Sequence, residues 1–122
     1  MKAIEIIKIG SNLLRDKKIA SYMLDSELLL SKTLNKSREE ILTNLDKKLN
    51  KKDILEFKNF LKRRSKNEPM AYILGEKEFW SKKFKVTRET LIPRPETELL
   101  VDKLENLYKE KNITILDIGT GS

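Results

Sequence analysis

A glycine turn near the C-terminus is the part of this 122-residue sequence best suited to chemistry. The stretch ITILDIGTGS (113–122) is a compact apolar run that leads into Asp117, Gly119 and Gly121. The apolar run predicts a buried strand, and the glycines predict a tight turn after it. Glycines let the backbone approach a ligand that side chains would exclude, and in α/β domains such a turn opens a cofactor site. Asp117 could fix the turn by accepting backbone amides, or it could meet a cationic ligand.

Other features limit the chemistry that the turn can support. Two glycines after a strand also mark a simple sharp turn, and this turn lacks the lysine of a phosphate-binding P-loop. The chain has no histidine and no cysteine, which excludes imidazole bases, thiol nucleophiles, disulfides and the usual zinc sites. No apolar run approaches the roughly 20 residues that a membrane span needs, and the N-terminus does not read as a signal peptide. We therefore expect a cytoplasmic protein without a metal.

The net charge of +7 is concentrated in one segment, residues 47–66. This segment holds nine lysines and arginines against Asp53 and Glu56, and nine minus two accounts for the whole net charge. Such a segment could steer nucleic acid or an acidic protein toward the chain. It could equally be the solvated face of a helix.

The first half of the chain has the pattern of short amphipathic helices. Apolar residues at helical spacing predict helices over residues 3–16, 21–34, 38–43 and 50–66 and a single turn over 70–74. Ser37 and Glu40 fit a capping box, Asn50 fits an N-cap, and Gly10 is a weak point of the first helix. Short helices joined by short turns predict a small bundle, which we assign to a domain of residues 1–74.

The pattern changes in the second half of the chain. Aromatic and β-branched residues at 78–80 and 83–87 flank Ser81 and Lys82, which predicts a β-hairpin within a connector of residues 75–94. Pro95 suits the first turn of a helix that runs to about Tyr108 with an apolar stripe. With the strand over 113–118, this helix begins an α/β domain, which we assign to residues 95–122.

Several of these segments together resemble one family, the HemK-like protein-glutamine N-methyltransferases of peptide-chain release factors. The similar pieces are EPMAYILG (68–75), EFW (78–80), IPRPETE (92–98), the glycine turn, and DSELLL (25–30) in the N-terminal helices. The resemblance implies a mainly α fold: a small helical bundle, a β-hairpin connector, and the first helix and strand of a Rossmann-like α/β methyltransferase domain.

The resemblance also implies S-adenosylmethionine as the methyl donor and the glutamine of a release factor's Gly-Gly-Gln motif as the acceptor. It implies a role for the bundle in recruiting that protein substrate. The cofactor-binding residues that it implies are the following: Asp117, Gly119, Thr120, Gly121 and Ser122. The family's Asn-Pro-Pro-Tyr motif and its ribose-binding acidic residue have no counterpart here, so we expect no catalytic residue in these 122 residues. We expect a chain that is cut within the donor motif and inactive alone, in which residues 95–122 either mediate self-association through their uncovered leucines or are mobile.

Alternative interpretations remain open for individual residues and for the whole chain. Phe79 and Trp80 could line a substrate cleft, although packing anchors are the commoner role of hairpin aromatics. Arg94 could lie near the donor or could pair with Glu96 or Glu98, and Thr97 and Glu98 fit helix capping. The alternative function is a stand-alone basic helical module that binds nucleic acid or the ribosome. The glycine turn makes direct nucleic-acid binding the less favoured interpretation.

Overall fold

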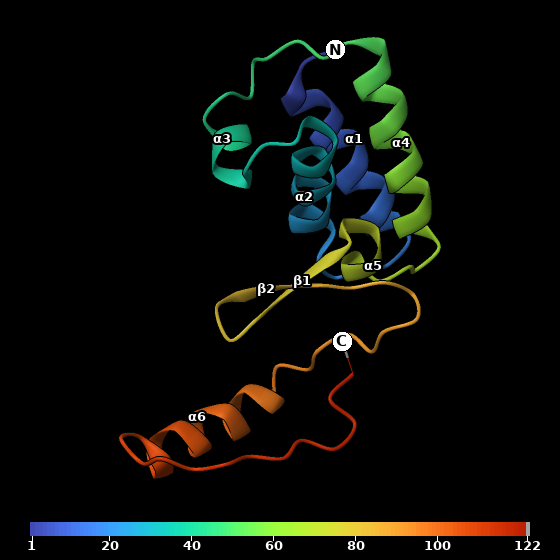
Figure 1. Cartoon of the computed structure of the whole chain (residues 1–122). Coiled ribbons are helices and arrows are strands. Elements are labelled where there is room, and N and C mark those ends of the chain that lie inside the picture. The colour runs from blue at the N-terminus through green and yellow to red at the C-terminus, as the bar shows by residue number, and fades with distance from the viewer. Residues whose placement is uncertain (122) are drawn as a thin grey trace. The chain divides into compact units, whose positions relative to one another are not determined.

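A computed structural model describes residues 1–121, which form six helices and one two-stranded antiparallel hairpin (Figure 1). The elements are α1 (Ala3–Asp16), α2 (Tyr22–Leu34), α3 (Arg38–Leu42), α4 (Lys51–Ser65), α5 (Met70–Leu74), β1 (Glu76–Phe79), β2 (Lys82–Lys85) and α6 (Thr97–Tyr108). The chain divides into two compact units, one from Met1 to Leu74 and one from Gly75 onward. The predicted mainly α fold, with a helical bundle followed by a hairpin, is confirmed.

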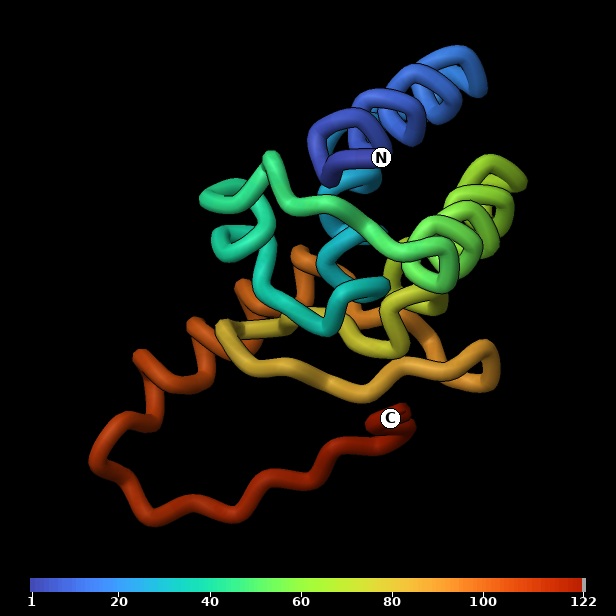
Figure 2. The backbone as a smooth tube through the Cα atoms, turned by 90° about the horizontal axis from the view of Figure 1, so that it is seen from above, coloured from blue at the N-terminus to red at the C-terminus, as the bar shows by residue number. Residues whose placement is uncertain are grey.

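The first unit, Met1–Leu74, is a bundle in which α1, α2 and α4 enclose the core (Figure 2). Its fully buried apolar side chains come from all three helices: Ile6, Leu14, Leu29, Leu30 and Phe57. The N-terminus is held by the segment before α4, because the amide of Ala3 donates to the carbonyl of Lys47 at 2.9 Å and that of Leu49 donates to the carbonyl of Met1 at 3.0 Å. The start of α1 and the start of α4 are therefore fixed together.

A buried ion pair ties α2 to the C-terminal end of α4. The side chain of Asp25 is 4% exposed, and it accepts hydrogen bonds from Arg64 Nε at 2.7 Å and from Ser21 Oγ at 2.9 Å. Arg64 also donates to the backbone carbonyl of Glu68 at 3.0 Å. Arg63 donates to both carboxylate oxygens of Glu68, at 2.9 and 2.6 Å, and this hydrogen bonding raises the pKa of its guanidinium. These contacts fix the turn between α4 and α5.

Gly10 lies where side chains of α2 and α4 pack directly against the backbone of α1. A Cβ atom on this residue would lie 2.8 Å from Cζ of Phe57 and would overlap Oγ of Ser26. Ser26 uses that hydroxyl to donate to the carbonyl of Ile7 at 2.8 Å. The glycine that weakens α1 as an isolated helix is therefore required by the packing of the bundle.

The helix caps agree with the sequence pattern. Ser37 and Glu40 form the predicted capping box, and the hydrogen bonds from Ser37 hold the pKa of the Glu40 carboxyl below its usual value. Asn50 caps α4 by accepting a hydrogen bond from the amide of Asp53 at 2.8 Å. The helix bounds differ from the predicted ones by at most two residues. At α6 the difference arises because the first bonds after Pro95 join residues three apart, which is turn geometry and not α-helix.

The second unit, from Gly75 onward, departs from prediction in two places. The hairpin turn lies at Trp80 and Ser81, one residue earlier than predicted, with Phe79 opposite Lys82. The predicted strand over residues 113–118 was wrong for this structure, because these residues have no strand hydrogen bonds and lie exposed. A strand exists only through pairing, and β1 and β2 pair with each other.

Replacing Arg64 by alanine should destabilise the bundle strongly. The change leaves the Asp25 carboxylate buried without its cation, which typically costs about 3–5 kcal/mol. Lys58→Ala on the same helix is the matched control, because Lys58 is exposed and its loss should change stability by less than about 0.5 kcal/mol. Urea unfolding followed by circular dichroism measures both, and equal midpoints for the two variants would contradict the role given to the pair.

Replacing Gly10 by alanine should also lower stability, although alanine is the better helix former by about 1 kcal/mol. The added methyl group overlaps Ser26 and Phe57, and overpacking of this kind costs about 1–3 kcal/mol or more. The double variant Gly10→Ala, Ser26→Ala removes one of the two contacts and should recover part of the loss. A thermal melt that shows Gly10→Ala to be as stable as the parent would show that the helices have room to separate.

Candidate functional site

The glycine turn has a backbone that only glycine adopts easily. Gly119 and Gly121 have φ angles of +76° and +75°, in the left-handed region. A Cβ atom built on either residue would meet no other atom within 4 Å. The turn therefore presents bare backbone with open space beside it.

The polar side chains of the turn at Asp117 and Thr120 make no hydrogen bond or ion pair within the part of the chain that the structure describes. Asp117 and Thr120 are exposed, and neither side chain has a hydrogen bond or an ion pair to residues 1–121. Ser122, the last predicted cofactor-binding residue, lies outside the described residues. Within residues 1–121, therefore, no hydrogen bond of the Asp117 side chain fixes the turn.

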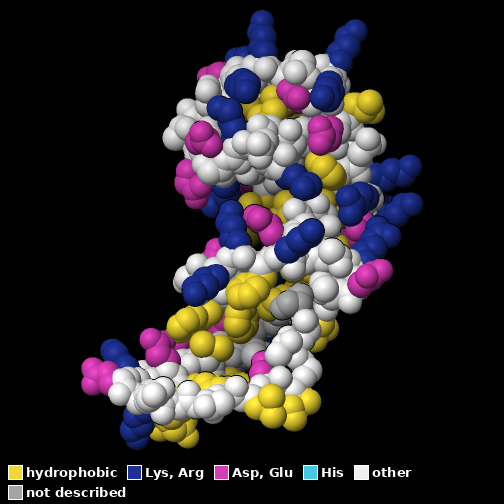
Figure 3. Space-filling view, viewed as in Figure 1, with side chains coloured by type: hydrophobic (Ala, Val, Ile, Leu, Met, Phe, Trp, Pro, Cys, Tyr) yellow, Lys and Arg dark blue, Asp and Glu magenta, His cyan; other side chains and the backbone are white. Residues whose placement is uncertain are grey.

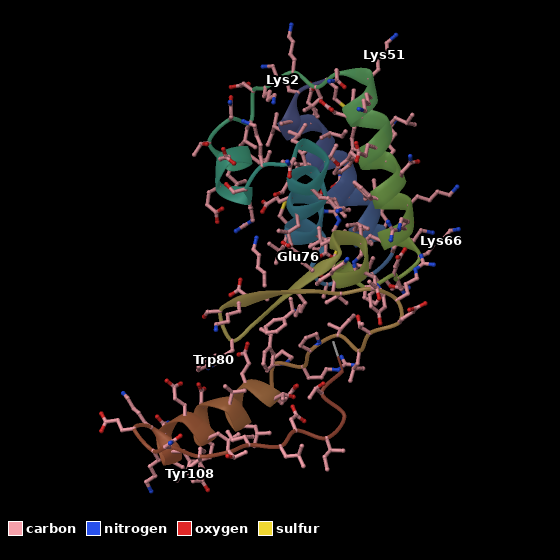
Figure 4. The ribbon with its side chains drawn as sticks, in the orientation of Figure 1. Lys2, Lys51, Lys66, Glu76, Trp80 and Tyr108 are labelled. Atoms are coloured by element: carbon pink, nitrogen blue, oxygen red, sulfur yellow. The ribbon has the colours of Figure 1, made fainter. Side chains whose placement is uncertain are left out.

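A second cluster joins the hairpin to α6, and sequence reasoning missed it. The backbone amide of Trp80 donates to Glu98 Oε1 at 2.6 Å, and its indole Nε1 donates to Asp102 Oδ1 at 2.8 Å. Glu98 and Asp102 are four residues apart, so they lie on one face of α6. Figure 4 labels Trp80 at the hairpin turn. The acidic spacing at 98 and 102 was the available signal, but no residue pattern named its partner.

These contacts settle several of the open interpretations. Glu98 binds the turn of the hairpin, so it is neither the capping residue nor the ion-pair partner of Arg94. Arg94 is exposed and has no ion pair within the described residues. Phe79 packs edge-on against Phe84, with ring centroids 6.0 Å apart, which is the role of a packing anchor.

The basic segment 47–66 contains two kinds of residue. Arg63 and Arg64 are bound to Glu68 and Asp25 and hold the bundle together. The lysines on α4 are exposed, and none forms an ion pair within the described residues. The charge available to a partner is therefore that of the lysines.

Two other kinds of site are absent from the described residues. No group of acidic side chains in residues 1–121 could hold a metal ion. No helix in the same range is long and apolar enough to cross a membrane.

Comparison with known proteins gives a consistent set of relatives. The sequence pattern of the PrmC N-terminal domain matches residues 5–75, more than half of the chain. A protein of Coxiella burnetii named release factor glutamine methyltransferase is 51% identical over 100 residues, covering 81% of this chain and 36% of that protein. Proteins with the same name from Buchnera aphidicola subsp. Schizaphis graminum and Vibrio cholerae are 46% identical over 98 residues and 42% identical over 116 residues. These matches cover 80% and 95% of this chain and 36% and 41% of the relatives.

Replacing Asp102 by alanine should release the indole of Trp80 to solvent. Trp80 is the single tryptophan of the chain, so tryptophan fluorescence reports on this one side chain. We expect acrylamide to quench the fluorescence of Asp102→Ala more efficiently than that of the parent, because a hydrogen bond to a carboxylate no longer holds the ring. Lys103→Ala, at the neighbouring exposed position, is the control and should quench as the parent does. Equal quenching in all three proteins would show that the ring is held by other contacts.

Proposed function

This chain belongs to the PrmC N-terminal domain family, and on that premise we propose that it is the N-terminal part of a methyltransferase acting on peptide-chain release factors. The observation that carries the proposal is the identity of 42–51% to proteins named release factor glutamine methyltransferase, over 80–95% of this chain. The chain spans about two fifths or less of the length of these relatives. The reaction therefore belongs to the longer protein, and we expect these 122 residues alone to be inactive.

We assign the donor to S-adenosylmethionine and the acceptor to the side-chain amide of the glutamine in a release factor's Gly-Gly-Gln motif. When bound, S-adenosylmethionine supplies a methyl group activated by a sulfonium. Amide nitrogen is a weak nucleophile, so the reaction depends on positioning more than on a strong base. That requirement is compatible with a chain that carries no histidine and no cysteine.

The glycine turn has the features that a donor site needs. The open space beside Gly119 and Gly121 lets backbone amides approach a ligand, as glycine turns after strands do in α/β domains. The Asp117 carboxylate, free of partners within the described residues, can accept hydrogen bonds from a ligand or face its positive charge. Thr120 and Ser122 complete the set of residues proposed to hold the donor.

Several large apolar side chains of the second unit are exposed to solvent. Leu99, Leu100 and Leu107 on α6 are 51–70% exposed, and Ile115, Leu116 and Ile118 are 62–88% exposed. In a longer chain we propose that they pack against further parts of the methyltransferase domain. In this chain alone we propose that they favour self-association, since burying each such side chain contributes about 1.5–3 kcal/mol.

The stand-alone binding module is the weaker alternative. A module that bound nucleic acid through its basic segment would have no use for a glycine turn with open backbone. The relatives, moreover, share their similarity across most of the chain and not across the helical unit alone.

A chimera tests the proposed function directly. In it, this chain replaces the matching region of the Coxiella burnetii relative, and the product is incubated with tritiated S-adenosylmethionine and a purified release factor. We expect tritium in the peptide that contains the Gly-Gly-Gln motif, and none when the glutamine is replaced by alanine. A folded chimera that labels no release factor would overturn the proposal.

Two glycine variants of the chimera test the donor site with matched backbones. Gly119→Ala should weaken S-adenosylmethionine binding, measured by calorimetry, because the methyl group fills the space that the ligand approaches. Gly75→Ala is the control, because Gly75 has nearly the same φ angle, +77°, and equally open surroundings. The two variants carry the same backbone strain, so an equal loss of affinity in both would assign the effect to strain and remove Gly119 from the site.

A further inference from the structure

The outer face of α4 carries a row of lysines with one leucine among them. We call it the lysine stripe, and its residues are Lys51, Lys52, Leu55, Lys58, Lys62 and Lys66. Successive members are three or four residues apart, apart from the adjacent first pair, so they lie along one face of the helix. Figure 3 shows basic side chains along the edge of the helical unit where α4 runs, and Figure 4 shows Lys51 and Lys66 at its two ends.

The stripe plays no part in holding the bundle together. α4 packs into the core through Phe57 and Leu61, which lie on the opposite face of the helix from Leu55. None of the five lysines has an ion pair in residues 1–121. The two carboxylates of α4, on Asp53 and Glu56, are half-buried, and neither forms an ion pair with a lysine of the stripe within residues 1–121. The lysines of this face are therefore not held in ion pairs by the described residues.

Leu55 lies in the middle of the lysines and is 62% exposed. An apolar residue among polar, charged neighbours matches the anatomy of a binding surface, which commonly has an apolar centre and a polar rim. From Lys51 to Lys62 the stripe covers 12 residues of helix, which span about 16 Å along the axis and match about three turns of a partner helix.

We propose that the lysine stripe is the docking surface for an acidic protein surface with an apolar residue at its centre, and that the release factor provides this surface. Only the identity of the partner depends on the proposed function. Charge complementarity requires an acidic partner, and Leu55 favours protein over nucleic acid. A phosphate backbone would bring polar, strongly hydrated groups against that leucine, and the stripe contains no aromatic side chain on which a base could stack.

Charge and apolar contact make separable contributions. Exposed lysines act mainly on the association rate and lose their effect in salt, because the screening length is about 10 Å at 0.1 M salt. The contact of Leu55 is short-ranged and apolar, so salt leaves it in place.

The test measures binding of the 122-residue chain to a purified release factor by surface plasmon resonance, at low and at high salt. Lys51→Gln, Lys58→Gln should lower the affinity roughly fivefold at low salt, through slower association, and should have little effect at high salt. The control Lys17→Gln, Lys36→Gln lowers the net charge equally, from +7 to +5, at exposed positions outside α4 and should bind as the parent does.

Separate variants test the proposed apolar contact of Leu55. Leu55→Ala should lower the affinity by a similar factor at both salt concentrations, while leaving stability unchanged because alanine favours the helix. Leu24→Ala, on α2, removes an exposed leucine elsewhere on the bundle and should have no effect.

Each outcome decides between the proposals. Equal binding by the stripe variants and their controls, or no binding by the parent chain, would overturn the docking surface, and methyl transfer by the chimera would still support the proposed function. A short RNA duplex is the second probe. If the lysine variants lose affinity for the duplex but keep it for the release factor, the stripe is a nucleic-acid surface and the proposal is wrong.

Discussion

The buried carboxylate of Asp25 is the constraint on which the architecture of the bundle depends. A carboxylate with 4% of its side chain exposed is tolerated only where a cation and hydrogen-bond donors surround it. Arg64 and Ser21 meet that need, and to do so α4 must end beside the start of α2. The same arginine binds the backbone carbonyl of Glu68, which sets the course of the chain into α5. The packing of apolar side chains could accept small shifts of α4 along its axis, but this ion pair cannot.

The pair also explains why the bundle could be predicted in outline but not in detail. Helical spacing and the caps at Ser37 and Asn50 are local, and they placed the helices to within two residues. The arginine that pairs with Asp25 lies 39 residues away along the chain, and the carboxylates bound by Trp80 lie up to 22 residues away, so no local pattern names them. The apolar run at 113–118 was predicted as a strand because its composition is that of a buried strand. Composition does not determine which strands pair. In the described residues β1 and β2 pair with each other, and neither pairs with residues 113–118.

The candidate site, like the bundle, could be predicted from the sequence only in part. The conformation of the glycine turn followed from residue type, since Gly119 and Gly121 adopt the left-handed backbone that their presence suggests. Charge counting found the basic segment but could not separate its members. Arg63 and Arg64 directly follow Lys62 in sequence. The two arginines form ion pairs within the first unit, with Glu68 and Asp25, whereas Lys62 faces solvent. Only the rotation of α4 about its axis, set by Phe57 and Leu61 in the core, assigns each cation to one role.

The turn of the hairpin has a consequence for how the second unit folds. Trp80 and Ser81 have φ angles of +48° and +58°, the signs of a type I′ turn, which asparagine and glycine adopt readily and tryptophan does not. Each such residue costs on the order of 1–3 kcal/mol, and an isolated two-stranded hairpin is marginal even with a favourable turn. The hydrogen bonds from Trp80 to Glu98 and Asp102 offset that strain only once α6 has formed. Hairpin and α6 should therefore appear and disappear together as a single cooperative folding unit, in which amide protons of β1 and β2 exchange at the rate at which the helix opens.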